Sequence, residues 1–180
     1  QAIYFSLIGG IVTFTAMFFA EPIFQFIGHD ESVRELETKY WRYLTIGGFF
    51  PICLAAVSSF FNGRGNTYPV MWASLLATCL NILLNYLLIF GHFGFPEMGI
   101  SGAGLSTVIS QFFNLSLLLI MTFMGDNNVK YKTISGWKFD KKLFTRLIRY
   151  GLPNGIHFFL DIAAFSAFIL IVGRLGASQL

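Results

Sequence analysis

The sequence predicts an all-α integral membrane protein with five transmembrane helices. The chain of 180 residues is 55% hydrophobic and only 12% charged, about half the charged fraction of an ordinary soluble domain. Residues 1–20, 43–63, 65–96 and 98–125 contain no Asp, Glu, Lys or Arg. Each stretch reaches the ~20 residues that a membrane-spanning helix needs. Because these runs are continuous rather than alternating, helices are favoured over barrel strands.

Five spans follow from these stretches and from one further apolar run near the C-terminal end. We expect them at residues 3–19, 41–61, 70–90, 98–124 and 152–172. Glycines and a proline inside the second span do not argue against a helix, because neighbouring helices can satisfy the freed backbone groups. The chain begins without an initiator Met or a basic leader and ends in a loop-like sequence, which predicts a piece of a longer polypeptide.

The charges between the spans predict how the chain is oriented. Connectors 21–40 and 91–97 are acidic, whereas connectors 64–69 and 125–149 are basic. Since connectors rich in Lys and Arg stay in the cytoplasm, we expect 64–69 and 125–149 to be cytoplasmic and 21–40 and 91–97 to be extracytoplasmic. Topology thus accounts for the net charge of +3. The expected partner is the lipid bilayer, and no nucleic acid is expected.

The long basic connector divides the chain into parts. Asp140 can cap a short helix whose basic and apolar side chains lie on opposite faces, the pattern of a helix in the membrane surface. A solvated basic loop is the alternative. The basic face would hold Lys141, Lys142, Arg146 and Arg149, and the apolar face Leu143, Phe144, Leu147 and Ile148. The predicted organisation is four helices over 1–124, an amphipathic linker over 125–149 and a further helix over 150–180.

Asp161 is the one acidic residue that we place within a membrane interior. A carboxylate there costs ~2.5–3.5 kcal/mol on insertion scales, so it should face a cavity or a partner. It could hold a proton, bind a cation or serve as a structural hydrogen-bonded residue. His157 lies four residues earlier on the same helical face and could pair with it, although an ordinary packed histidine is the alternative. Asn154 lies one turn further back as possible support.

The third span carries Asn81 and Asn85 four residues apart, on one face. Amide oxygens can coordinate a hard cation such as Na⁺, and interhelical hydrogen bonding is the alternative. Thr107 in the fourth span is a possible oxygen ligand facing them. A stripe of small residues in that span predicts close helix packing: Gly102, Ser106 and Ser110.

Motifs of soluble enzymes are missing from the sequence. It contains no paired catalytic carboxylates, no Ser/His/Asp set and no HExxH motif. We therefore expect no enzyme activity, no organic cofactor and no metal beyond a possible coupling Na⁺.

Four stretches of the chain carry a family resemblance. They are residues 20–28 with 40–44, residues 60–67, residues 81–107 and residues 150–176. The third is the most specific, with Asn-Ile-Leu-Leu-Asn-Tyr at 81–86 followed by Gly94, Pro96 and Glu97. Together they resemble the multidrug and toxic compound extrusion (MATE) family, most closely its NorM-like branch. The resemblance implies twelve helices in two six-helix lobes around a cleft, of which this chain would supply spans three to seven.

The resemblance also implies a function and its site residues. It implies antiport across the inner (plasma) membrane by alternating access, in which drug-like, often cationic compounds leave while Na⁺ or H⁺ enters. Asn81, Asn85 and Thr107 match the first-lobe cation site, whose span-one Asp would lie in the missing remainder of the transporter. Asp161, eight residues after Pro153, matches the acidic position of the second lobe.

Three other readings stay open. A lipid-linked oligosaccharide flippase of the same superfamily is the nearest, although flippases tend to line their cleft with basic residues and these spans hold none in their interiors. A non-transporting membrane interaction fragment is the second, and Asp161 and the polar face of the third span argue against it. An ion channel is the third, but no repeated filter-like segment is visible.

Overall fold

The computed structural model describes residues 1–27, 31–123 and 139–174, and within these ranges it contains helices and no strand. The chain divides into two compact units, residues 2–137 and residues 138–180. The predicted linker residues up to 138 and the last residues of the chain lie outside the described ranges.

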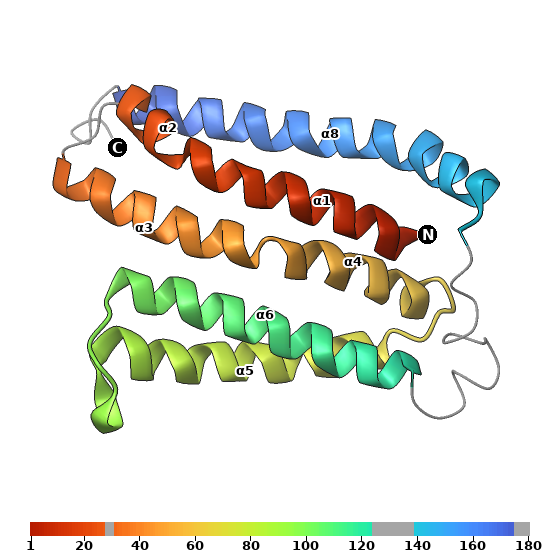
Figure 1. Cartoon of the computed structure of the whole chain (residues 1–180), viewed down its shortest axis with the longest axis horizontal. Coiled ribbons are helices and arrows are strands. Elements are labelled where there is room, and N and C mark those ends of the chain that lie inside the picture. The colour runs from red at the N-terminus through yellow and green to blue at the C-terminus, as the bar shows by residue number, and fades with distance from the viewer. Residues whose placement is uncertain (28–30, 124–138, 175–180) are drawn as a thin grey trace. The chain divides into compact units, whose positions relative to one another are not determined.

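The first span is a helix with a change of winding near its end. Helix α1 (Ala2–Ala16) runs into a 3₁₀ turn, η1 (Met17–Phe19), and then into α2 (Ala20–Ile27) (Figure 1). In the turn the Ala20 N–H bonds to the Met17 carbonyl, so the Ala16 carbonyl loses its usual α-helical donor. The indole N–H of Trp41 donates to that carbonyl at 3.1 Å. The tight turn is thereby compensated from a neighbouring helix.

The second span is two helices rather than the single one predicted for residues 41–61. Helix α3 (Glu31–Gly47) ends one residue before α4 (Phe49–Asn62) begins, and Gly48 lies between them. Pro51 has no N–H with which to bond the carbonyl four residues earlier. It therefore sits where such a donor is not needed, in the first turn of a new helix.

The third and fourth spans form a helical hairpin. Helix α5 (Tyr68–Phe90) ends at Gly91 with φ 68°, and α6 (Ile100–Phe123) returns after the short 3₁₀ helix η2 (His92–Gly94). The helices approach closely at Gly102, where an added Cβ would lie 2.6 Å from the Leu88 carbonyl oxygen. Ser106 and Ser110 are also buried. The small-residue stripe thus packs as predicted.

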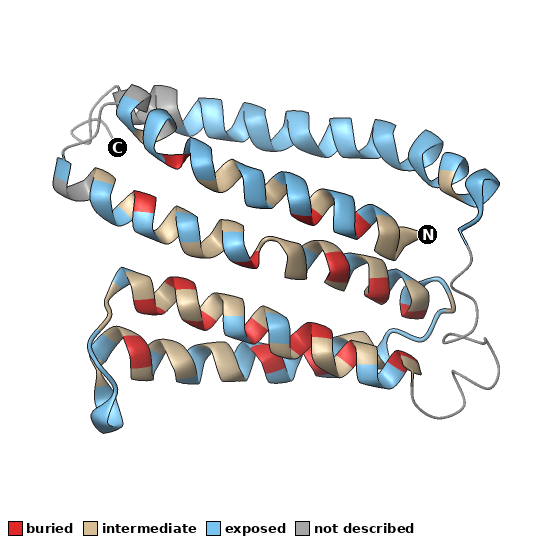
Figure 2. Ribbon diagram, viewed as in Figure 1, coloured by how far each residue is buried: buried red, intermediate tan, exposed pale blue. Residues whose placement is uncertain are grey.

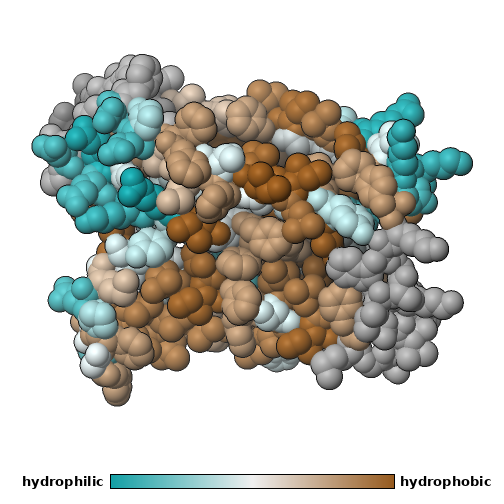
Figure 3. Space-filling model, in the orientation of Figure 1, coloured by the Kyte–Doolittle hydropathy of each residue, from teal (hydrophilic) through white to brown (hydrophobic). Residues whose placement is uncertain are grey.

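The interior of the first unit lies where α4, α5 and α6 meet (Figure 2). Its buried cluster comprises Cys53, Val57, Phe61, Ala73, Leu115 and Leu118. Helix α1 packs against α4, and α3 packs against α6. Many large apolar side chains instead lie on the outside, and Figure 3 shows hydrophobic residues over most of the visible face. Such a surface fits lipid rather than water.

The second unit is one long helix, α8 (Lys141–Arg174). The Asp140 carboxylate accepts from the N–H groups of Lys142 and Leu143 at 2.8 and 3.1 Å, so Asp140 is the predicted cap. The sequence predicts a surface helix and a separate span that starts near Leu152. In the structure both are parts of the one helix α8. Pro153 removes one backbone hydrogen bond, and helices bordering a membrane tolerate that loss.

Five helical segments of the described chain are long and apolar enough to cross a membrane. They are Ala2–Pro22, Arg34–Asn62, Tyr68–Phe90, Ile100–Phe123 and Lys141–Ile169. The predicted all-α membrane fold with five transmembrane helices is confirmed.

Candidate cation-binding site

The two asparagines of α5 form a hydrogen-bonded pair that faces α6. The Asn85 side chain donates its Nδ2 hydrogen to Asn81 Oδ1 at 3.0 Å. The hydroxyl of Ser106 on α6 donates to Asn85 Oδ1, and Ser106 is completely buried. The small-residue pattern of α6 predicts only a packing role for Ser106. The contact of Ser106 with Asn85 depends on the register in which α5 and α6 pack, and the sequence of one helix alone does not show that register.

A pocket of about 240 Å³ lies beside this pair. All of its lining residues come from α5 and α6: Ser74, Ala77, Thr78, Asn81, Thr107, Ser110, Gln111 and Asn114. The structure therefore brings Asn81 and Thr107 to one pocket, while Asn85 adjoins it through Asn81. Ser74, Gln111 and Asn114 extend the site toward the other end of the hairpin.

The pocket is rich in hydrogen-bond acceptors. Three of its hydroxyls donate to carbonyl oxygens four residues earlier in their own helices, at 2.7–2.9 Å: Thr78, Thr107 and Ser110. Their protons are thus used, and their oxygens keep lone pairs for a ligand. Asn114 is only 8% exposed, and its Oδ1 accepts no hydrogen bond from any described residue. Its Nδ2 lies 3.5 Å from Ser74 Oγ.

An unpaired buried acceptor has an energetic cost that a ligand can offset. Leaving such an oxygen without a donor costs about 1–3 kcal/mol. A cation or a hydrogen-bond donor in the pocket would remove that cost. All eight lining side chains are uncharged, so the pocket supplies oxygen ligands but no counter-charge. It can therefore complete a cation site but needs a carboxylate from elsewhere.

The remaining candidate residues lie on α8, in the other unit. His157 Nδ1 lies 3.1 Å from Asp161 Oδ2, which pairs the two residues one helical turn apart. Both side chains are exposed, with 80% and 66% of their surface accessible. Asn154 is also exposed and sits one turn before His157. The candidate residues thus form two groups, one on the α5–α6 hairpin and one on α8.

Long apolar helices, outward apolar side chains and a buried polar cluster together define a multi-pass membrane protein. A family model described as MatE matches residues 1–87. A solved structure titled as the inward-facing conformation of a multidrug resistance MATE family transporter of the MOP superfamily superposes with a TM-score of 0.71. It is 22% identical, and the match covers 84% of this chain and 34% of that one.

Curated relatives give the same result over most of the chain. A probable multidrug resistance protein NorM of Geobacillus kaustophilus is 32% identical over 157 residues, covering 82% of this chain and 33% of the relative. A probable NorM of Idiomarina loihiensis is 27% identical, covering 98% and 38%. The probable multidrug resistance protein YoeA of Bacillus subtilis is 29% identical, covering 96% and 38%.

The chain is thus similar over most of its length to members of the MATE family, which are transporters rather than enzymes. The resemblance to the NorM-like branch is likewise confirmed by these relatives. The chain spans about a third to two-fifths of the length of the curated relatives that it matches.

Proposed function

We propose that this chain is part of a transporter that exports drug-like, often cationic amphiphilic compounds in exchange for Na⁺ or H⁺. The names of the relatives support the substrate class, since NorM and YoeA proteins are described as probable multidrug resistance proteins. Transport would occur by alternating access between two lobes in the inner membrane. The remainder of the transporter would supply the helices that the relatives have beyond the matched region.

The acceptor-rich pocket between α5 and α6 is the observation that carries this proposal. In a membrane interior, polar side chains that are not needed for packing mark an ion or substrate path. Here Asn81 and Thr107 share one pocket with a buried oxygen on Asn114 that has no hydrogen-bond partner in the described part of the chain. A coupling cation would take these oxygens as ligands, and an acidic residue outside the chain would supply the charge.

Asp161 is the proposed coupling residue of the second group. Its carboxylate binds Na⁺ or a proton, and the nearby His157 orients it through the 3.1 Å contact. Neutralising the carboxylate lowers the cost of moving it into a less polar environment. A bound cation can shift the equilibrium between the two conformations of the lobes only by the difference in its affinity for them. Drug release and cation entry would be linked through that difference.

A transport assay on the full-length protein tests the proposal. In proteoliposomes loaded with a fluorescent cationic dye, an inward Na⁺ or H⁺ gradient should drive efflux from the compartment that mimics the cytoplasm. Asp161→Asn should abolish or strongly reduce this coupled efflux, and Asn85→Ala should weaken it. Asn62→Ala, the same change at the exposed end of α4, is the matched control. Unchanged coupling in Asp161→Asn would exclude the second-lobe site.

A further inference from the structure

The length of α8 places its first turns outside the hydrocarbon layer. Its 34 residues rise about 1.5 Å each, which makes the helix about 51 Å long. The hydrocarbon core of a bilayer is only about 30 Å thick, and the apolar residues 152–172 are enough to fill it. Residues 141–151 therefore continue the helix by about three turns, or about 16 Å, through a headgroup layer of about 5–8 Å and beyond it.

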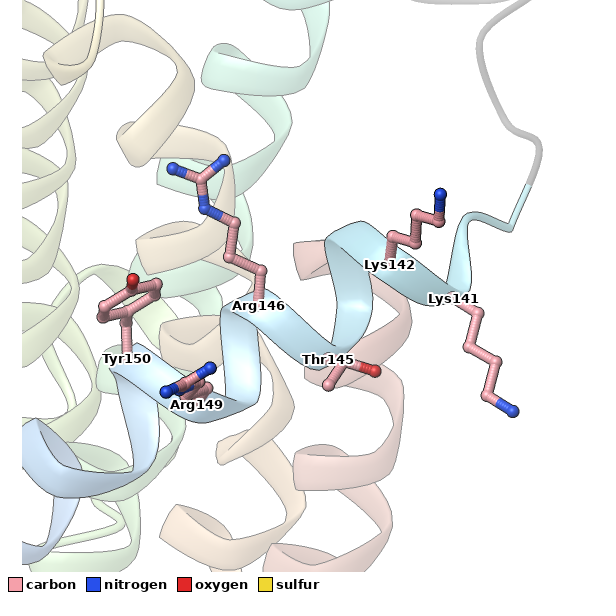
Figure 4. A pocket seen from close by; sticks show the side chains of 6 residues that line it. All are labelled: Lys141, Lys142, Thr145, Arg146, Arg149 and Tyr150. Atoms are coloured by element: carbon pink, nitrogen blue, oxygen red, sulfur yellow. The ribbon is translucent and has the colours of Figure 1, made fainter.

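These first turns carry a concentrated positive surface. Four basic side chains and two polar ones line a hollow along the first turns of α8 (Figure 4): Lys141, Lys142, Thr145, Arg146, Arg149 and Tyr150. All six are exposed. Among residues that the structure describes, no carboxylate forms an ion pair with any of the four basic side chains. The Asp140 carboxylate already accepts hydrogen bonds from N–H groups at the start of the helix. A bound anion would therefore contact the basic side chains and not these N–H groups.

A second hollow adjoins the first and has a different character. It shares Arg146 and Tyr150 with the basic hollow, and its other lining residues are Leu143, Leu147, Gly151 and, at its far end, Asn154. A cationic surface thus continues directly into an apolar one along the same helix. A soluble anion would bind only in the basic hollow. A phospholipid would place its phosphate in the basic hollow and part of an acyl chain along the apolar one.

We propose that the start of α8 is a binding site for the phosphate of an anionic phospholipid such as phosphatidylglycerol. Clustered Lys and Arg next to a transmembrane helix attract anionic headgroups, and guanidinium groups bind phosphate oxygens in a bidentate manner. Arg146 and Arg149 are the main phosphate ligands, and Tyr150 sits at the interface, where tyrosine is enriched. The site does not depend on the proposed antiport or on Asp161.

Lipid binding to the full chain in detergent micelles tests this assignment. Native mass spectrometry would compare phosphatidylglycerol with phosphatidylcholine of the same acyl chains. Each near-surface basic residue contributes about a fivefold gain in affinity for an anionic surface, so R146Q/R149Q should weaken phosphatidylglycerol binding roughly 30-fold. K39Q/R42Q removes the same charge from α3 and should leave binding within about twofold. Phosphatidylcholine should bind weakly to all variants.

Further measurements distinguish a lipid site from a soluble-anion site. Leu143→Gln with Leu147→Gln removes the apolar hollow and should also weaken phosphatidylglycerol binding, while circular dichroism confirms that α8 remains helical. Millimolar inorganic phosphate should not displace the lipid. Displacement by phosphate, equal binding of both lipids, or a phosphatidylglycerol preference that survives R146Q/R149Q would each overturn the assignment.

Discussion

The hydroxyl of Ser106 on α6 donates a hydrogen bond to the side-chain oxygen of Asn85 on α5. Ser106 is completely buried, and Asn85 in turn donates to Asn81. This chain of bonds fixes the register of the hairpin at the level of the candidate site. The orientation of the Asn81 side chain toward the pocket therefore depends on Ser106, acting through Asn85, and neither of these two residues lines the pocket.

Replacing Ser106 should destabilise the hairpin. Ser106→Ala removes the donor to Asn85 and leaves a partly buried amide oxygen unpaired, which should cost about 1 kcal/mol. Thermal unfolding of the full chain in detergent, followed by circular dichroism, measures the loss. Ser116→Ala is the matched control, because among the described residues that hydroxyl donates to the Phe112 carbonyl of its own helix and to no other helix. Equal unfolding temperatures for the two variants would remove the proposed role of Ser106.

Adding a methyl group at Gly102 should separate the two helices. The new Cβ would lie 2.6 Å from the backbone oxygen of Leu88, and a backbone atom cannot move aside as a side chain can. Overpacking of this kind costs about 1–3 kcal/mol, which we expect for Gly102→Ala in an unfolding titration. A Cβ added at Gly151 on α8 would meet no described atom within 4 Å apart from its chain neighbours and its own helix backbone, so Gly151→Ala should be neutral or stabilising by up to about 1 kcal/mol. The reverse order of stabilities would contradict the close packing at Gly102.

The unpaired oxygen of Asn114 should make stability depend on the cation. If Na⁺ binds in the pocket, the unfolding temperature of the full chain should rise with NaCl but not with choline chloride, since a ligand of the folded state stabilises it. Asn114→Leu should lose most of this Na⁺ response. Without Na⁺ the variant should be as stable as the parent or more stable, because an unsatisfied buried acceptor is removed. A Na⁺ response that is the same in both proteins would place the cation elsewhere.

The indole of Trp41 should stabilise the 3₁₀ turn in the first span. Trp41→Phe keeps an aromatic ring near Phe24, whose centroid lies 5.9 Å away, but removes the hydrogen bond to the Ala16 carbonyl. We expect a loss of about 1 kcal/mol and faster amide hydrogen exchange over residues 17–27. Trp72→Phe, at an exposed position of α5, should leave this exchange unchanged. If Trp41→Phe also leaves the exchange unchanged, another contact holds the turn.

Much of the fold could be predicted because its signals are local. Continuous apolar runs gave the five spans, and Asp140 at the start of an amphipathic pattern gave the cap of α8. The spacing of Gly102 with Ser106 and Ser110 predicted a packed stripe on α6. The break at Gly48 was not predicted, since Pro51 inside a run reads equally well as an interruption within one helix or as the first turn of a second.

The sequence by itself determined which segments cross the membrane and which of their residues are polar, because an apolar solvent requires apolar side chains along each span. Only the tertiary structure decided which polar residues meet. Asn85 and Ser106 lie on different helices, so their contact depends on how α5 and α6 pack. The role of Asn114 in the candidate site also depends on tertiary structure. Whether its side-chain oxygen has a hydrogen-bond partner is decided by every neighbouring helix, and the pattern along one helix does not show it.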